Sequence, residues 1–126
     1  MDGRAFDATR LLVHVLMGAG KFAAARDLLR GMLAAAPDDA GVRRNLVRAH
    51  LGLGEYVEAE PVARMLAGQE AGDDRLPALF FHAHALWGSG RTEECRAVIE
   101  RYAALRSGLD GAPAREAGVG TRAPGR

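Results

Sequence analysis

The segment LGLGEY at residues 51–56 has two counterparts elsewhere in the chain, MGAGKF at 17–22 and WGSGRT at 87–92. Each contains two glycines one residue apart, and the flanking stretches carry apolar residues at helical spacing. Because glycine adopts turn conformations that other residues avoid, each pair predicts a tight turn between two helices. The second glycines of the three pairs are Gly20, Gly54 and Gly90. They lie 34 and 36 residues apart, a spacing that indicates repeated helix-turn-helix units.

Other positions recur in register with these glycines. Eight residues before the second glycine stands a large apolar residue or its substitute: Leu12, Leu46 and His82. Five residues after it stands a small residue: Ala25, Ala59 and Cys95. Small side chains are expected there because the two helices of a unit cross closely. An aromatic residue two after the glycine, Phe22 or Tyr56, is expected to pack over the turn, and Thr92 replaces it in the third unit.

This pattern, with Pro37 ending the first unit, resembles the tetratricopeptide repeat (TPR). The resemblance implies an all-α fold in which three TPR helix-turn-helix repeats form a short right-handed superhelix, an α-solenoid. We expect a three-repeat domain over residues 1–106, and a disordered C-terminal tail over 107–126, where large apolar residues are too few to offset the entropy of ordering. The repeats are expected at about 5–37, 38–71 and 75–106. The expected helices are about 5–18, 22–36, 39–52, 56–67, 76–88 and 92–106.

Two local features refine these helices. Asp38 and Asp39 precede the third helix and supply N-capping side chains. Pro61 lies inside the fourth helix and removes a hydrogen bond to the Val57 carbonyl, so we expect that helix to start late or to kink.

Composition limits the function classes. Lys and Arg total 17 against 16 Asp and Glu, a net charge of +1 that predicts no strong attraction to nucleic acid. No apolar run approaches the ~20 residues of a membrane-spanning helix, so no membrane insertion is expected. A single cysteine excludes an internal disulfide and fits the cytoplasm, the expected location.

The sequence offers little catalytic chemistry. The glycine pairs follow no strand and do not continue as a phosphate-binding loop. His82 and His84 are two residues apart, and so point to nearly opposite sides of a helix and cannot share a metal. Cys95 is read as a buried small residue and His50 as an interior histidine. No nucleophile, base and acid recur at diagnostic spacing, so we expect neither an enzyme nor a cofactor or metal site.

In TPR proteins the first helices of the repeats line a concave groove that binds a protein partner, and the resemblance implies the residues that face it. They are Arg10, His14, Met17, Arg44, Asn45, Arg48, Leu51, Phe80, Phe81, His84 and Trp87. The alternative for Phe80, Phe81 and Trp87 is packing inside the protein, and the sequence leaves both open.

One class of TPR grooves grips a partner's C-terminal carboxylate with lysine, arginine and asparagine at fixed positions. Asn45 occupies one of these positions, but His14, Pro77 and Phe81 occupy others. The carboxylate clamp is therefore absent, and an extended or helical apolar segment is the expected ligand.

The stretches LGLGEYVEA at 51–59 and LFFHAHALWGSG at 79–90 resemble the small TPR chaperones of bacterial type III secretion, in particular the YscY/SctY type. This resemblance implies binding and stabilisation of an export substrate of the YscX/SctX type. A generic bacterial TPR adaptor or assembly scaffold is the alternative, and a homodimer is left open. A further alternative, from a different class, is a regulatory or catalytic helical domain that uses His14 or His84.

Overall fold

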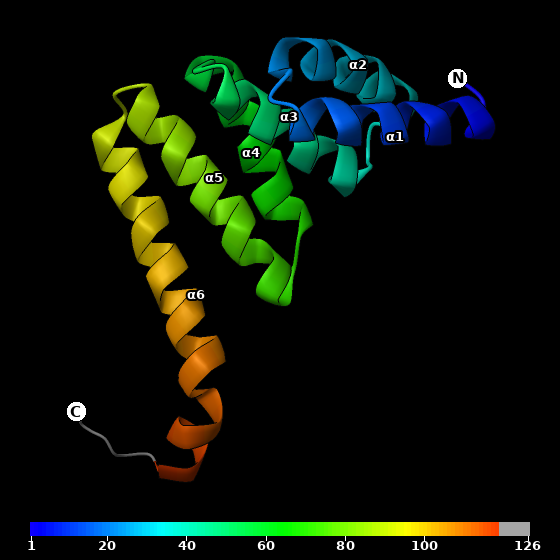
Figure 1. Cartoon of the computed structure of the whole chain (residues 1–126). Coiled ribbons are helices and arrows are strands. Elements are labelled where there is room, and N and C mark those ends of the chain that lie inside the picture. The colour runs from blue at the N-terminus through cyan, green and yellow to red at the C-terminus, as the bar shows by residue number, and fades with distance from the viewer. Residues whose placement is uncertain (119–126) are drawn as a thin grey trace.

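The computed structural model describes residues 1–118 of the chain, with side chains described to residue 108. These residues form an all-α fold, as the sequence predicts, and a short 3-10 helix, η1 (Gly72–Asp74), precedes the fifth α-helix (Figure 1). The α-helices are α1 (Gly3–Gly18), α2 (Phe22–Ala35), α3 (Ala40–Gly52), α4 (Tyr56–Gln69), α5 (Arg75–Gly88) and α6 (Thr92–Gly118). The first five begin and end within two residues of their predicted bounds.

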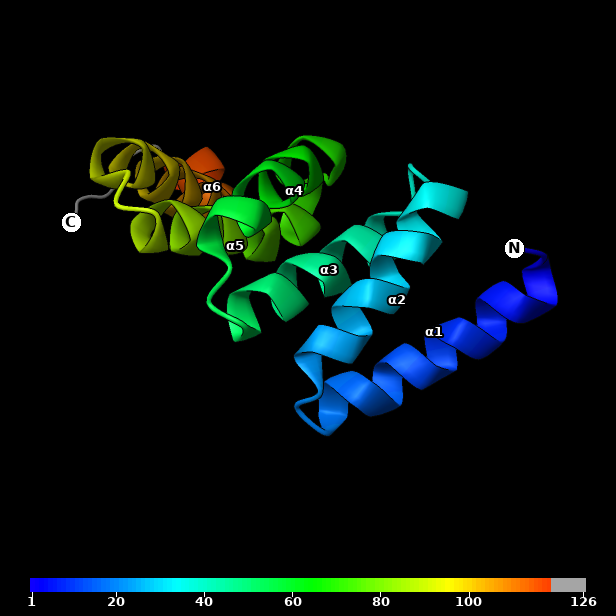
Figure 2. The same cartoon turned by 90° about the horizontal axis from the view of Figure 1, so that it is seen from above.

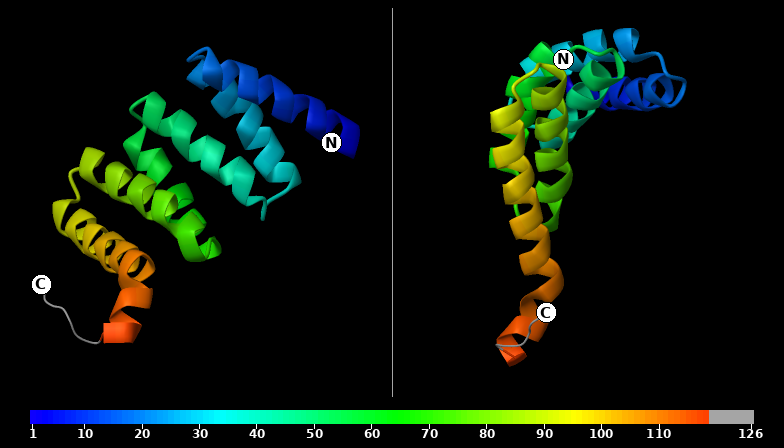
Figure 3. Two further views of the ribbon diagram at one scale, coloured as in Figure 1. Left: turned by 60° about the horizontal axis from the view of Figure 1, so that its bottom comes forward. Right: turned by 90° about the vertical axis from the view of Figure 1, so that its left-hand side faces the viewer.

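The helices form antiparallel pairs, α1 with α2, α3 with α4 and α5 with α6, which follow one another in chain order as a short solenoid (Figure 3). The view from above shows α3 between the first pair and α5 (Figure 2), in agreement with its contacts to α2 and α5. Each first helix after α1 therefore packs on the preceding pair.

Each turn between the two helices of a pair contains one glycine in the left-handed region. The φ angles are 74° at Gly20, 73° at Gly54 and 79° at Gly90. L side chains avoid this conformation, which explains why glycine recurs at this place. The predicted interhelical turns are confirmed.

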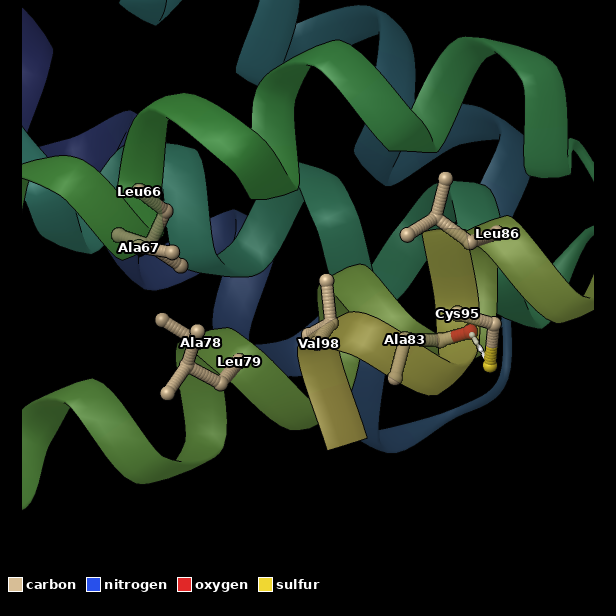
Figure 4. Close-up of a cluster of buried hydrophobic side chains, with 8 residues drawn as sticks. All are labelled: Leu66, Ala67, Ala78, Leu79, Ala83, Leu86, Cys95 and Val98. Carbon is tan, nitrogen blue, oxygen red and sulfur yellow. Dashed lines mark hydrogen bonds between the residues drawn. The ribbon is translucent and has the colours of Figure 1, made fainter. Parts of the chain in front are cut away.

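Two apolar clusters make up the core. One joins the first pair to α3 and contains Val13, Ala25, Leu29, Met32, Val42, Leu46 and Ala49. The other joins α4 to the third pair and contains Leu66, Ala67, Ala78, Leu79, Ala83, Leu86, Cys95 and Val98 (Figure 4). The predicted small positions are all buried, and Cys95 donates a hydrogen bond from Sγ to the Ala83 carbonyl at 3.3 Å. Close packing of the paired helices explains the need for small side chains there.

The recurring aromatic residue packs on the following repeat, a contact that the sequence did not predict. An added Cβ at Gly52 would lie 2.7 Å from the Phe22 ring, and one at Gly88 would overlap the Tyr56 ring. Each aromatic ring therefore packs against the first glycine of the following repeat. Tyr56 also lies beside its own turn, as predicted, because an added Cβ at Gly54 would be 3.9 Å from its ring, whereas an added Cβ at Gly20 would not meet Phe22 within 4 Å. The first glycine of the first repeat, Gly18, has no preceding repeat, and an added Cβ there would meet no described atom within 4 Å.

Asp39 caps α3 as predicted, because its carboxylate accepts a hydrogen bond from the Val42 amide at 3.1 Å. The expected late start of α4 is wrong: this helix begins at Tyr56 and continues through Pro61 to Gln69. Buried Ala59 and Ala63 on either side of the proline anchor the helix, and this packing outweighs one missing backbone bond.

The predicted end of the sixth helix at residue 106 is wrong, because α6 continues to Gly118. Residues 119–126, the end of the predicted tail, lie outside the described residues. The division of the chain into a repeat domain and a disordered tail stays a prediction.

We predict that Gly88→Ala destabilises the protein by about 1–3 kcal/mol, because the new methyl group overlaps the Tyr56 ring and forces the second and third repeats apart. Gly18→Ala is the matched control, since both glycines are the last residue of a first helix. Its methyl group meets open space, and alanine favours a helix over glycine, so stability should be unchanged or slightly higher. Urea unfolding of both variants measures the difference, and equal free energies of unfolding would show that the ring does not require a glycine.

Candidate functional site

A pocket of about 420 Å³ lies where the first helices of the repeats approach one another. Its lining comes from α1, the start of α2, α3 and α5. The residues are His14, Met17, Gly18, Phe22, Asn45, Arg48, Leu51 and Phe81, which we call the first-helix pocket. The stacking of repeats thus brings together side chains that are up to 67 positions apart, from His14 to Phe81.

Most of the predicted groove residues converge on this pocket. His14, Met17, Asn45, Arg48, Leu51 and Phe81 line it. Sequence reasoning missed Gly18 and Phe22 as lining residues, although the glycine pair and the aromatic position had marked both as repeat features. Pro77, the third departure from the carboxylate clamp, is exposed and does not line the pocket.

Three predicted groove residues lie elsewhere. Phe80, His84 and Trp87 line a second pocket, also of about 420 Å³, between α5 and α6. We call it the α5–α6 groove, and its other lining residues are Leu79, Ala83, Cys95, Ile99 and Tyr102. The two pockets have the same volume, so the chemistry of their linings distinguishes them.

The structure decides between groove and core for the three aromatic residues. The exposed fractions of Phe80 and Trp87 are 57% and 66%, so internal packing is the wrong alternative for both. Phe81 is half-buried against the core cluster of the third pair and also lines the first-helix pocket. Phe81 therefore packs against the core and faces the pocket at the same time.

Two predicted residues do not line either pocket, because ion pairs hold them. Arg10 lies 3.5 Å from the Asp39 carboxylate, and its guanidinium stands 5.1 Å from the Phe6 ring centroid. Arg44 lies 2.7 Å from the Glu70 carboxylate. These arginines tie first helices to neighbouring segments, and their placement in the binding groove is not supported by the geometry.

Among the described residues, the polar side chains of the first-helix pocket have no protein partner. Neither the Asn45 nor the Arg48 side chain forms a hydrogen bond or ion pair within this part of the chain. The half-buried Asn45 amide can donate and accept, and the exposed Arg48 guanidinium can only donate. Met17, Leu51 and Phe81 supply apolar surface beside them. Such a combination can pair with the polar groups of a ligand while it covers an apolar side chain.

Two charge clusters connect neighbouring repeats, the first partly buried and the second centred on the buried Glu60 carboxylate, and the sequence did not indicate their partners. In the first, Glu55 lies 2.5 Å from Arg26 Nη1 and 2.8 Å from His50 Nδ1, so His50 is interior as predicted. In the second, Glu60 lies 2.7 Å from His82 Nε2 and 3.2 Å from Arg91 Nη1. Both clusters span two repeats, which is why no local spacing revealed them.

The surroundings of both carboxylates favour ionisation. Burial alone would raise the pKa of Glu60, but the hydrogen bond from His82 and the nearby guanidinium groups outweigh burial and lower this pKa. The hydrogen bond from His50 and the charge of Arg26 lower the pKa of Glu55.

The histidines do not form a metal centre. His82 is buried against Glu60, whereas His84 is exposed and contacts the Tyr56 and Phe80 rings at 5.7 and 6.3 Å between ring centroids. Among the residues that the structure describes, no group of three potential metal ligands occurs.

The comparisons with known proteins agree with this geometry. Two family models described as tetratricopeptide repeat match the chain, one over residues 16–80 and the other over 76–101. The chain belongs to the tetratricopeptide repeat family. No curated protein and no solved structure matches it.

TPR repeats generally bind protein partners, so membership of this family supports a role in protein–protein interaction. No described helix is both long enough and apolar enough to cross a membrane.

We predict that Glu60 makes the stability of this TPR protein depend on acid pH. Its folded-state pKa is lowered, so the stability it provides is present above the unfolded value of about 4.3 and is lost as the pH falls through the folded value. Glu60→Gln keeps the shape of the side chain but cannot ionise. Thermal melts from neutral pH to about pH 3 should show a shallower acid decline for this variant. Identical pH profiles for variant and parent protein would contradict the assignment.

Proposed function

We propose that the chain is a non-catalytic adaptor that binds a segment of another polypeptide in the first-helix pocket. The observation that carries the proposal is a pair of polar side chains, Asn45 and Arg48, which lie among apolar residues and have no partner within the described residues. Membership of the TPR family supports protein binding in general.

The chemistry of the pocket favours an extended segment over a helix. An amide side chain such as that of Asn45 matches a peptide group, because each has one acceptor oxygen and N–H donors. In a helix most backbone groups already bond to one another, whereas an extended segment leaves them free. Arg48 suits a carboxylate or a backbone carbonyl, and the apolar lining suits a side chain of the ligand.

We further propose that the partner is an export component of bacterial type III secretion of the YscX/SctX type, which the chain binds and stabilises in the cytoplasm. The resemblance of residues 51–59 and 79–90 to the small chaperones of that system supports this identity. An adaptor or assembly scaffold for another complex would use the same pocket, so the partner must be determined by experiment.

Co-expression with an YscX/SctX-type protein tests the partner. If the proposal holds, the two proteins co-purify, and the candidate is degraded or insoluble when expressed alone. If the candidate is stable alone and does not co-purify, the type III role is wrong. Proteins recovered with the chain from its own cells would then identify the complex that it serves.

We predict that Asn45→Ala weakens binding of the partner segment about fivefold to tenfold, because a hydrogen bond to its backbone is lost. Arg48→Ala should weaken it up to about fivefold and less at high salt, since the guanidinium is exposed. Calorimetric titration with peptides that tile the co-purified partner gives these affinities.

Arg30→Ala is the control, because Arg30 is an exposed arginine of α2 that lies outside the pocket. Thermal melts must show that each variant is folded. Unchanged affinity in both pocket variants would exclude the first-helix pocket as the site.

A further inference from the structure

The α5–α6 groove is the place where a next repeat would pack. Its floor is made by Ala83 of α5 and by Cys95, Ile99 and Tyr102 of α6. In the first repeat the equivalent positions hold Val13, Ala25, Leu29 and Met32, which are all buried. In the second they hold Val47, Ala59, Ala63 and Leu66, which are also buried.

A first helix covers these positions in both earlier repeats. Leu29 and Met32 share a core cluster with Val42 and Leu46 of α3, and Leu66 shares the other cluster with Ala78 of α5. In the third repeat, by contrast, Ile99 is 51% exposed and Trp87 at the rim is 66% exposed. The groove therefore has the position and the apolar lining that are needed to pack against a helix.

Charged residues beside the α5–α6 groove follow the pattern of the two earlier repeats. In the first two repeats, the residue six positions after the turn glycine is charged. It pairs with the residue that directly follows the turn glycine of the next repeat. Arg26 pairs with Glu55 at 2.5 Å, and Glu60 pairs with Arg91 at 3.2 Å. The equivalent residue of α6 is Arg96, which has an exposed pair with Glu93 of its own helix at 3.6 Å. Such an exposed pair contributes little, so Arg96 can accept a carboxylate from a helix in the groove.

We propose that the α5–α6 groove is a docking site for an amphipathic helix of a partner protein, with an apolar stripe against Ile99 and Tyr102 and a carboxylate opposite Arg96. The helix takes the place that α3 and α5 occupy on the earlier pairs. This site is separate from the first-helix pocket and does not rest on its proposed function.

The charges at the groove disfavour a second copy of the chain as the occupant. Its exposed first helix, α1, carries apolar Leu12 and Val15 at the packing positions, but Lys21 would then stand opposite Arg96. Like charges would meet where both existing repeat interfaces place opposite charges. The charges therefore disfavour head-to-tail stacking of copies and favour an acidic partner helix.

A stapled helical peptide of residues 39–55 provides a probe of known chemistry. It contains the apolar stripe of α3 that packs on the first pair and ends with Glu55, the carboxylate that pairs with Arg26. The full chain has a single tryptophan, so its fluorescence reports on Trp87 at the rim of the groove. Docking should shift the emission to shorter wavelength in a saturable way.

Ile99→Asp should weaken binding of the peptide about tenfold, because a charge then faces its apolar stripe. The matched control is Ala97→Asp, which places the same carboxylate at an exposed position of α6 outside the groove. Arg96→Glu should weaken binding about fivefold at low salt, and a peptide with Glu55→Arg should recover the loss. This charge exchange at an exposed site remains informative even if Ile99→Asp does not fold.

Four results would overturn the proposal. The first is the absence of a saturable shift, and the second is equal affinity of the Ile99→Asp and Ala97→Asp proteins for the peptide. Another is shielding of Trp87 from an aqueous quencher that grows with protein concentration, together with a larger sedimenting mass, because a second copy would then fill the groove. The last is strong shielding at every concentration, which would assign the groove to a segment of the chain itself.

Discussion

The packing of each first helix on the preceding pair is the contact on which the rest of the structure depends. A single pair of helices cannot bury its own apolar face, and Leu29 and Met32 become core residues when α3 covers them. The same contact forms the first-helix pocket, because it brings α1, α3 and α5 side by side. Where the contact is missing, apolar side chains stay exposed: Leu12 and Val15 at one end, 48% and 58%, and Ile99 at the other.

Polar and aromatic contacts give this packing its register. Phe22 and Tyr56 each require a glycine in the following repeat. The charge pairs between repeats have opposite polarity at equivalent positions, with Arg26 meeting Glu55 and Glu60 meeting Arg91. If the third repeat packed directly on the first, Arg26 would meet Arg91, and the like charges would oppose that arrangement. The alternation therefore favours one order of repeats, and burial of the Glu60 carboxylate makes its pairing costly to lose.

Features set by local sequence were predictable. The turn glycines require positive φ, and the small positions lie where two neighbouring helices of one pair cross, so a single period in the sequence indicates both. Asn45, Arg48 and Leu51 of the candidate site were found in the same way, because repeat position alone places them on the inner side of α3.

Features that depend on contacts between repeats were not predictable from the same pattern. Repeat position alone assigned Trp87 and Leu51 to one groove, but Trp87 lies in a separate pocket beside α6, and no further first helix among the described residues covers it. The partners of Glu55 and Glu60 depend on how the pairs stack, and Arg44 is drawn to Glu70 near the end of α4. The length of α6 was not predictable because residues 107–118 lack apolar periodicity and contain glycine and Pro113, which disfavour a helix.

The central claim is that the first-helix pocket holds a partner's polypeptide, and methyl NMR of labelled methionine tests it most directly. The four methionines lie in different places, so their methyl resonances report separately. Met17 lines the pocket, and Met32 is in the core. Met65 is exposed on α4, and Met1 is the first residue of the chain. On titration with a binding peptide from the partner, the Met17 methyl resonance should shift and saturate while those of Met32 and Met65 stay in place. A saturable shift of Met65 with Met17 unchanged would place the ligand on α4 and contradict the account.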